Sequence, residues 1–227
     1  MRQVAQIMGM PISIDIPSCS DDKIFETIFK WFKQVDERFS PFKKNSELSK
    51  YNRGEFSGSE LSSDMRDIIE SCNRWKEITG GYFSAWYNQE FDPSGYVKGW
   101  SIKKAGNLIN GLGFKTYCIG AGGDIMACSD GQKEWTIGIQ DPGDVKKILK
   151  RLSIKNSAVA TSGTYERGKH IINPKTCKPA DEFMSVSIIG PDIITADVLS
   201  TTLFAMGNKG IEFVSKFADY DAVFIAA

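Results

Sequence analysis

The sequence lacks an excess of charge of either sign and is almost without histidine. Lysine and arginine together number 28, aspartate and glutamate together also number 28, and there is one histidine, so the formal net charge is zero. Proteins that bind nucleic acid usually carry a basic excess. The composition therefore disfavours nucleic acid as a partner, although a neutral chain can still carry a local basic patch.

Cysteine is present in an odd number and without the spacing of a metal or redox motif. The five residues are Cys19, Cys72, Cys118, Cys128 and Cys177, and no two of them form a C-x-x-C pair. This pattern disfavours a zinc ribbon, a redox dithiol and a disulfide framework. We expect buried or partly buried free thiols in a reducing compartment.

Long apolar runs are missing as well. No segment approaches the roughly 18 apolar residues of a membrane span, and the start of the chain holds no continuous apolar core of signal-peptide length. We therefore expect a cytoplasmic protein without a membrane anchor. The 227 residues are enough for one large domain or two small ones that share a core. We predict a single domain over residues 1–227, with two intertwined subdomains as the alternative.

Hydrophobic periodicity predicts a mixture of helices and strands. Apolar and polar residues alternate from Ile12 to Ile16, which is typical of a half-buried strand. Helical spacing predicts a first helix that begins near Ser20–Asp22 and extends to Phe39. A second begins near Ser62 or Ser63 and stops at Gly80-Gly81, and a third carries Trp100 to Leu112.

Short β-like runs dominate the rest of the chain. The predicted strands are Thr116–Ile119, Trp135–Ile139, Leu152–Val159, Ser185–Ile189 and Ala222–Ala226, and the predicted helices are Thr195–Met206 and Gly210–Phe217. Strands and helices do not alternate strictly. The pattern therefore favours an α+β fold with mixed or antiparallel sheets and packed helices over a doubly wound α/β fold.

The first polar cluster that could carry chemistry lies in the predicted helix at 195–206. Asp197, Ser200 and Thr201 are spaced i, i+3 and i+4, so one carboxylate and two hydroxyls share a helix face. Hard oxygen ligands of this kind suit Mg²⁺. The alternative is an ordinary polar face or cap of a buried helix.

A second cluster is the segment from Asp92 to Trp100, which begins Asp-Pro-Ser-Gly and contains Lys98. A free backbone carbonyl in such a turn can ligate a metal, and Lys98 can reach a phosphate or a ring. The alternative is an ordinary β-turn followed by a solvated lysine.

A third cluster, Gly120-Ala121-Gly122-Gly123-Asp124, follows an apolar strand. Paired glycines let the backbone approach a flat or phosphorylated ligand. The spacing is not G-x-G-x-x-G and no helical pattern follows, so a Rossmann site is disfavoured. The alternative is a hairpin turn.

The fourth cluster joins the segment Thr161–Arg167, which begins Thr-Ser-Gly, to the segment His170–Pro174. Small hydroxyl residues beside glycine suit contacts with phosphate. His170 is the single histidine, and it is the one side chain whose ordinary pKa suits a base near neutral pH. A lone histidine is otherwise more often structural.

In this order the clusters resemble the ApbE family of FAD:protein FMN transferases. The resemblance covers nearly the whole chain, and its elements are Met8-Gly9, Arg38–Phe42, Ser46–Leu48, Asn52, Asp92–Gly95, Lys98-Gly99, Ala121–Asp124, Trp135–Ile139, Asp141-Pro142, Thr161–Gly163, His170–Pro174 and Ala196–Thr201. Each element is weak alone, but the ordered set is specific.

The resemblance implies a fold, a reaction and a set of ligands. The family has an α+β fold, described as a T-fold-like core, takes FAD as substrate and uses one or two Mg²⁺ ions. It joins FMN through a phosphoester to a serine or threonine of a target flavoprotein and releases AMP.

The resemblance also implies a role for individual residues. Asp197, Ser200 and Thr201 would bind the metal with the carbonyl of Gly95, and His170 would activate the acceptor hydroxyl. The implied contacts with FAD are Met8, Phe42, Tyr82, Phe83, Ser84, Asp92, Lys98, Gly122, Gly123, Asp124, Thr161, Ser162, Ile171 and Ile172.

Some positions depart from the family pattern. Phe42 stands where many members have tyrosine, Ser84 where many have aspartate, and Cys177 where a turn glycine is common. The segment between Phe83 and Asp92 is also shorter than in longer members. These changes weaken the contacts implied around Tyr82–Ser84 most.

The sequence therefore predicts a Mg²⁺-dependent FAD:protein FMN transferase. Two alternatives stay open. A Mg²⁺-dependent FAD pyrophosphatase would use the same residues with water in place of the acceptor hydroxyl, and a non-catalytic flavin-binding protein would keep FAD intact.

Overall fold

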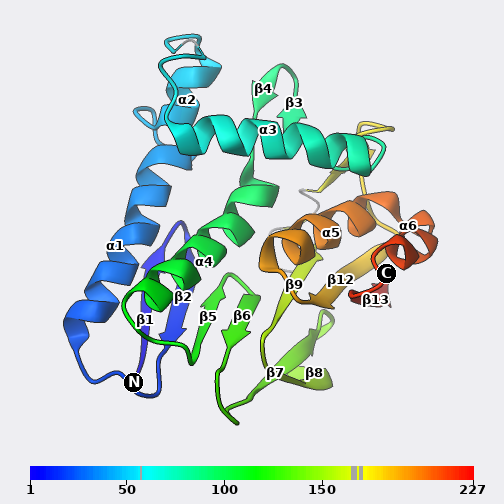
Figure 1. Cartoon of the computed structure of the whole chain (residues 1–227). Helices are drawn as coiled ribbons and strands as arrows, with labels where there is room; N and C mark the ends of the chain where they lie inside the picture. The colour runs from blue at the N-terminus through cyan, green and yellow to red at the C-terminus, as the bar shows by residue number, and fades with distance from the viewer. Residues whose placement is uncertain (57, 165–167, 169–170) are drawn as a thin grey trace.

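Seven antiparallel strands form the main sheet of the computed structural model, which describes residues 1–56, 58–164, 168 and 171–227. In order across the sheet they are β1 (Arg2–Ile7), β2 (Met10–Asp15), β5 (Tyr117–Ala121), β6 (Asp124–Cys128), β9 (Ser157–Gly163), β12 (Phe183–Gly190) and β13 (Asp221–Ala226). Every neighbouring pair is antiparallel. Helices and an antiparallel sheet together confirm the predicted α+β class (Figure 1).

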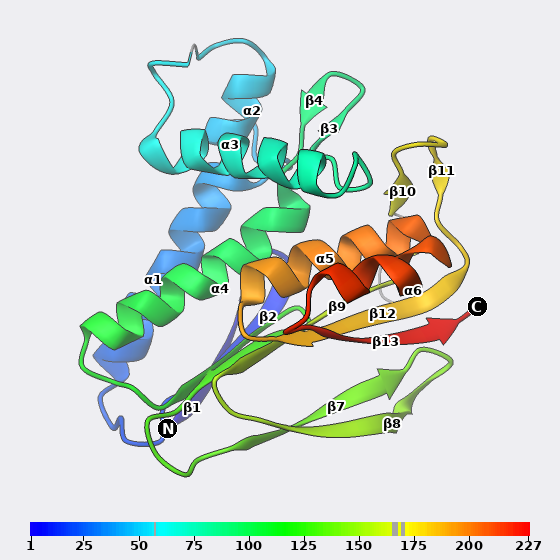
Figure 2. The same cartoon turned by 45° about the vertical axis from the view of Figure 1, so that its right-hand side comes forward.

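Three long helices cover one face of this sheet. They are α1 (Asp22–Phe39), α4 (Ser94–Gly111) and α5 (Ile193–Met206). Alternate strand residues such as Ile12 and Ile14 point to these helices and are fully buried. Helix α5 lies against β9 and β12, is flanked by α4, and is buried along most of its length (Figure 2). This helix carries Asp197.

A second apolar cluster lies at one end of the helical layer. It is built from the end of α1, the start of α4 and the segments α2 (Glu47–Asn52), α3 (Ser63–Ile78), β3 (Trp86–Tyr87) and β4 (Glu90–Phe91). In Figures 1 and 2 these segments sit above the main sheet. Arg38 ties them together, because its guanidinium bonds Asp64 at 2.8 Å and Ser62 Oγ at 2.7 Å.

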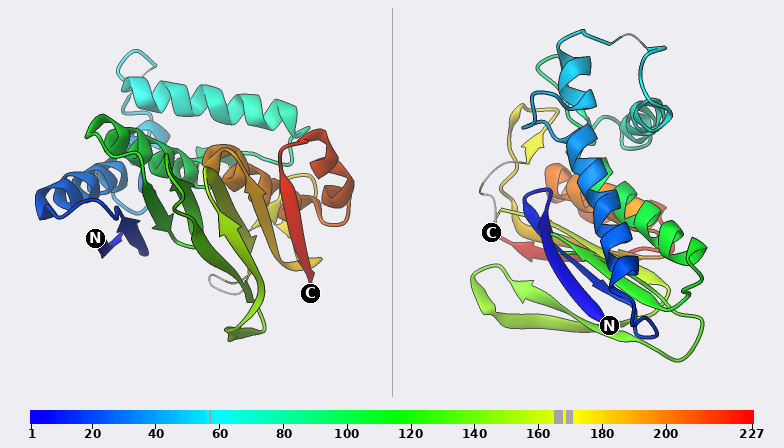
Figure 3. Two further views of the ribbon diagram at one scale, coloured as in Figure 1. Left: turned by 60° about the horizontal axis from the view of Figure 1, so that its bottom comes forward. Right: turned by 90° about the vertical axis from the view of Figure 1, so that its left-hand side faces the viewer.

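The opposite face of the sheet is partly covered by a β-ribbon. Its strands are β7 (Trp135–Asp141) and β8 (Asp144–Ile154), and the ribbon packs Ile154 against Ala127 and Val159 of the sheet. Figure 3 shows the ribbon on the side away from the helices. A short hairpin of β10 (Ile172–Asn173) and β11 (Lys178–Pro179) leads into β12. The last helical turns are α6 (Lys209–Phe213) and the 3₁₀ turn η1 (Val214–Lys216).

Polar side chains start α1, α3 and α5, and the sequence predicted the first two of these caps but not the third, since α5 begins at Ile193 rather than at Thr195. Asp21 accepts a hydrogen bond from the Lys23 amide at 2.9 Å, and Ser62 accepts one from the Met65 amide at 3.2 Å. The side chain of Asp192 caps α5 through the Thr195 amide at 3.0 Å. Each side chain satisfies an amide that has no partner inside its helix.

The predicted strand Leu152–Val159 is wrong. The chain turns between β8 and β9 at Asn156, whose φ of 50° is left-handed, so two strands of different sheets replace one. The Asn156 side chain holds this turn by bonding both the amide and the carbonyl of Ser129, at 2.8 and 3.0 Å. Asparagine tolerates left-handed backbone better than most residues, and the strand prediction ran through the polar residues Lys155-Asn156-Ser157 at this turn.

Other boundaries differ in smaller ways. The predicted helix Gly210–Phe217 ends as an α-helix at Phe213 and continues as η1. Helix α2 and the strands β1, β3, β4, β6, β10 and β11 had no predicted counterpart, and β8 was predicted only at its last three residues. The exposed Cys177 departs from the expectation of buried thiols. Within the described ranges, no helix combines the length and the apolarity that crossing a bilayer requires.

Candidate functional site

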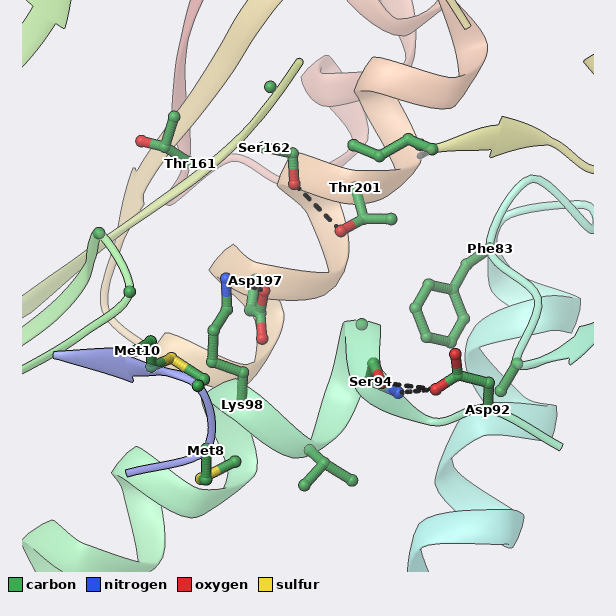
Figure 4. Close-up of a pocket in the computed structure, with 18 of the residues that line it drawn as sticks. Met8, Met10, Phe83, Asp92, Ser94, Lys98, Thr161, Ser162, Asp197 and Thr201 are labelled. Atoms are coloured by element: carbon green, nitrogen blue, oxygen red, sulfur yellow. Dashed lines mark hydrogen bonds and ion pairs between the residues drawn. The ribbon is translucent and has the colours of Figure 1, made fainter. Parts of the chain in front are cut away.

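A large cleft opens where the main sheet, the helical layer and the second apolar cluster meet. Its volume is about 1020 Å³. One wall is formed by the start of α4, the middle of α5 and strand β9, and the other by the loop after α1 and the segment 82–87. Segments that are distant in the sequence therefore surround one cavity (Figure 4).

Two tight hairpin turns reach the cleft with left-handed backbone. Met8 and Gly9, between β1 and β2, have φ of 57° and 71°, and Gly122 and Gly123, between β5 and β6, have φ of 53° and 89°. The third cluster is thus a hairpin turn, and this turn also lines the cleft. A Cβ on Gly122 would lie 2.6 Å from the Met10 sulfur, so glycine lets the two turns approach closely.

Helices α4 and α5 cross in contact at Gly99. A Cβ there would lie 2.9 Å from the Ile193 carbonyl oxygen and 3.0 Å from Asp197 Cβ. The Gly99 amide donates to Asp197 Oδ2 at 2.8 Å, which fixes one carboxylate oxygen. The close crossing therefore places Asp197, which is 1% exposed, beside the first turns of α4.

Lys98 joins two acidic residues at the same wall. Its ammonium lies 2.9 Å from Asp124 Oδ2 and 3.5 Å from Asp197 Oδ1. Burial lowers the pKa of Lys98, but the two carboxylates outweigh burial and raise it above its ordinary value. Burial raises the pKa of the Asp197 carboxyl, and the charge of Lys98 opposes that shift.

Asp124, which was predicted to contact FAD, lies behind the wall of the cleft. It is fully buried and is not part of the cleft lining. Its Oδ1 accepts from the Thr161 amide at 3.1 Å, and its Oδ2 faces Lys98. Asp124 therefore connects the β5–β6 hairpin, β9 and α4 behind the cleft wall.

Three hydroxyls form a connected row between β9 and α5. Ser162 Oγ lies 2.8 Å from Ser200 Oγ and 3.1 Å from Thr201 Oγ1, and Ser200 Oγ donates to the Asp197 carbonyl at 2.9 Å. Because a hydroxyl donates one hydrogen, these contacts are all satisfied if Thr201 donates to Ser162 and Ser162 donates to Ser200. This order leaves lone pairs on Thr201, which lines the cleft, whereas Ser200 is fully buried.

The predicted metal donors gather at this wall. Gly95 lies in the first turn of α4 beside Thr201, since a Cβ on Gly95 would lie 3.8 Å from Thr201 Oγ1. Carboxylate, hydroxyl and carbonyl oxygens are the donors that Mg²⁺ prefers. The buried charges also favour a cation, because one ammonium faces two carboxylates and buried charges are normally paired or bound to metal. The donor set therefore fits a hard divalent cation, although the described residues contain no cluster of three His, Cys, Asp or Glu side chains.

The other wall is aromatic, and it ranges from the exposed Phe42 to Phe83, which is 3% exposed and belongs to the second apolar cluster. Phe42 is 95% exposed at the mouth of the cleft, and Tyr82, Phe83 and Ser84 line it further in. The Thr79 hydroxyl accepts from the Phe83 amide at 3.0 Å and so fixes the start of this segment. Asp92 lies nearby and accepts from the Ser94 amide at 3.0 Å, which positions the first turn of α4.

Most of the predicted site residues therefore line one cleft. Those that do are Met8, Phe42, Tyr82, Phe83, Ser84, Asp92, Gly95, Lys98, Gly122, Gly123, Thr161, Ser162, Ile171, Ile172, Asp197 and Thr201. Asp124 and Ser200 lie directly behind the lining. His170, predicted as the base, lies outside the described residues.

Sequence reasoning missed some of the lining. Val35 and Phe39 at the end of α1, Met10, and the β7 segment from Ile137 to Gln140 also face the cleft. Phe39 and Ile137–Ile139 belong to the motifs that carry the family resemblance, and these motifs were the signal that could have identified them as site residues. The motifs could not show that these residues face the same cavity as Asp197.

Comparison with known proteins shows that this chain belongs to the ApbE family. The model of the ApbE family matches residues 8–89 and 85–224. A Haemophilus influenzae protein named FAD:protein FMN transferase is 25% identical over 267 residues, covering 88% of this chain and 77% of the relative. A Klebsiella pneumoniae protein of the same name is 31% identical over 160 residues, covering 66% of this chain and 49% of the relative, about half its length.

Solved structures show the same fold. The ApbE protein of Thermotoga maritima has a TM-score of 0.88 at 22% identity and is covered to 94%, with all of this chain matched. The flavin transferase ApbE of Vibrio cholerae has a TM-score of 0.85 at 21% identity, with 100% of this chain and 93% of that chain covered.

Proposed function

Because the chain belongs to the ApbE family, we propose that it is a Mg²⁺-dependent FAD:protein FMN transferase that attaches FMN to a serine or threonine of another protein. The observation that carries the proposal is the inner wall of the cleft. There one ammonium, two carboxylates and a row of hydroxyls meet beside a cavity of about 1020 Å³. That volume lies at the upper end of ordinary ligand pockets and suits a dinucleotide.

The metal would be held by this chain's own oxygen donors. Asp197 Oδ1, the Thr201 hydroxyl and the Gly95 carbonyl are the residues we assign to it, with Ser200 behind them. When bound, Mg²⁺ supplies positive charge that stabilises the charge developing on the pyrophosphate. The Gly99 amide keeps Asp197 oriented by holding its second oxygen.

The remaining residues bind and orient the substrate. Glycine turns at Gly9 and at Gly122-Gly123 allow backbone to approach a phosphate or a flat ring. The aromatic wall of Phe42, Tyr82 and Phe83 offers ring faces for the flavin or the adenine. In this proposal the pyrophosphate of FAD would lie at the inner wall and its rings at the outer wall.

We assign the base to His170. The acceptor hydroxyl must lose its proton as its oxygen bonds to the FMN phosphorus, while the bond from that phosphorus to the bridging oxygen breaks and AMP leaves. A neutral imidazole can accept this proton near pH 7. His170 immediately precedes Ile171, which lines the cleft.

Mass spectrometry of an acceptor protein tests the proposed function. The acceptor is incubated with the protein, FAD and Mg²⁺, and we expect an FMN-sized adduct on a serine or threonine. Asp197→Ala should lower the transfer rate by about 10²–10³-fold or more, the range for loss of one electrostatic stabiliser. His170→Ala should retain FAD binding and lose transfer. Asp219→Ala, an exposed acidic residue outside the cleft lining, is the control.

The two alternatives predict different products. Rapid release of FMN and AMP from FAD and Mg²⁺ without any acceptor would identify a pyrophosphatase. FAD that stays intact with Mg²⁺ and a competent acceptor would identify a flavin-binding protein. Transfer at the wild-type rate by Asp197→Ala without added metal would show that the metal site is misassigned.

A further inference from the structure

Lys98 is held unequally by its two acidic neighbours. Its ammonium is 2.9 Å from Asp124 and 3.5 Å from Asp197. Asp124 is also fixed from behind, because its other oxygen accepts from the Thr161 amide at 3.1 Å. The contact with Asp124 is thus the short and anchored one, and the contact with Asp197 is the one that can be given up.

Asp197 lines the cleft, and its Oδ1 is the oxygen that Lys98 approaches. Its Oδ2 is engaged by the Gly99 amide at 2.8 Å, so Oδ1 is the oxygen left for a cation. Asp197 is 1% exposed, and a carboxylate buried to this degree is costly without a counter-charge. Lys98 supplies that counter-charge within 3.5 Å.

We propose that Lys98 is the resident counter-ion of Asp197, and that a divalent cation takes this carboxylate over from Lys98 while Asp124 keeps the ammonium at the cleft wall. The inference rests on the metal site of the proposed function. It makes Asp124 a positioning residue, which acts on the metal site through Lys98, rather than a contact of the flavin substrate.

Two substitutions should change metal affinity in opposite directions. Lys98→Met removes a positive charge that competes for Asp197, so the metal-free protein should bind Mg²⁺ more tightly. Asp124→Asn keeps the shape and can keep the acceptor for the Thr161 amide, but it no longer attracts Lys98. The ammonium then turns to Asp197 as its remaining carboxylate, so Mg²⁺ should bind more weakly.

Isothermal titration of Mg²⁺ into protein stripped of metal by a chelator measures this directly, without FAD or an acceptor. We expect the dissociation constant of Lys98→Met to fall by about tenfold or more, since the ammonium that lies 3.5 Å from Asp197 Oδ1 would no longer repel a cation held by the same oxygen. For Asp124→Asn we expect it to rise several-fold. The matched control is Lys103→Met on the same helix, whose lysine pairs with Asp192 at 3.0 Å, and its affinity should equal that of the wild type.

Thermal unfolding of the same samples gives a second measurement. Without metal, Lys98→Met should unfold at a lower temperature than the wild type because two buried carboxylates lose their cation, and Mg²⁺ should raise its unfolding temperature by more. If Lys98→Met does not fold without metal, Asp124→Asn still tests the inference through its weakened affinity.

Each outcome has a defined meaning. Equal Mg²⁺ affinity in the wild type and both variants, or a shift of both in the same direction, would overturn this inference while leaving the metal site in place. If neither the wild type nor Lys98→Met bound Mg²⁺, the proposed metal site and this inference would both fall. Loss of FAD binding alone, with unchanged metal affinity, would make Lys98 a simple substrate contact.

Discussion

The two walls of the cleft differ in how their residues are held. The inner wall carries its polar groups on α4, α5 and β9, where Asp197, Ser162 and Ser200 are each less than 10% exposed and bonded to one another or to backbone. The outer wall carries aromatic side chains on loops, and Phe42 is 95% exposed. Residues that need fixed geometry thus lie on packed elements, and residues that offer contact area lie on loops.

This difference follows from the physical demands on each wall. Charges and hydroxyls without water need partners at hydrogen-bond distance, which rigid elements can provide. Ring faces need only area and orientation, so a loop can supply them. We therefore expect substitutions at the inner wall to change stability and activity together, and substitutions at exposed residues of the outer wall such as Phe42 to change binding alone. Phe83 is the exception on the outer wall, because it is 3% exposed and packs in the second apolar cluster.

The largest effect is expected at the helix crossing. Gly99→Val would place methyl groups against the Ile193 carbonyl, to which even a Cβ would come within 2.9 Å. The backbone of α5 at Ile193 cannot move away as a flexible side chain could. We therefore expect a loss of about 3 kcal/mol in the free energy of unfolding together with loss of transfer. Denaturant unfolding measures the first. Gly111→Ala, on the same helix with open space around it, should cost nothing, and an equal loss there would contradict the clash.

A smaller and pH-dependent effect is expected at the start of α5. Burial raises the pKa of Asp192, but the Thr195 amide and Lys103 outweigh burial and lower it below its usual value. The charged form is thus favoured on folding, and its contribution is present above about pH 4, the unfolded pKa, and is lost as pH falls through the folded pKa. Asp192→Ala should cost about 1 kcal/mol at pH 7.

The pH dependence gives the control for that substitution. The cost of Asp192→Ala should shrink in acid, as measured by unfolding at a series of pH values. Asp192→Asn keeps a capping side chain but loses the charge, so it should cost less than alanine at pH 7. A cost independent of pH would show that the charge contributes nothing.

A favourable effect of similar or smaller size is expected in the turn between β10 and β11. Cys177 has a φ of 56° and is exposed. Left-handed backbone is costly for a residue with a Cβ, so Cys177→Gly should raise the free energy of unfolding by about 0.5–1 kcal/mol after the added flexibility of the unfolded chain is counted. Cys177→Ala keeps the Cβ and should bring no gain, which separates backbone strain from loss of the thiol.

The smallest effect on stability is expected at the outer wall. Phe42 is so exposed that Phe42→Ala should change the free energy of unfolding by less than about 0.5 kcal/mol. It should nevertheless weaken FAD binding several-fold, because an aromatic contact contributes about 0.5–1.5 kcal/mol. Fluorescence titration with FAD measures this. Ile211→Ala, also exposed but outside the lining, should change neither quantity.

The sequence alone determined the fold class, the main helices and most of the residues around the cleft. Local signals explain this success. Helical spacing and capping side chains such as Ser62 depend on neighbours in the chain, and Asp197 and Thr201 share a face because of helix geometry alone. The ordered motifs added the family, which composition and periodicity could not have supplied.

Tertiary structure alone decided which of these residues meet and what each one contacts. The turn at Asn156 is held by Ser129, 27 residues away, so the residues around Asn156 could not show by themselves what stabilises it. Asp124 belongs by sequence to a glycine turn, yet folding buries it and pairs it with Lys98. Contacts between distant segments depend on how the layers pack, and no local spacing encodes that Gly99 lets α4 and α5 approach closely enough to place Lys98 beside Asp197.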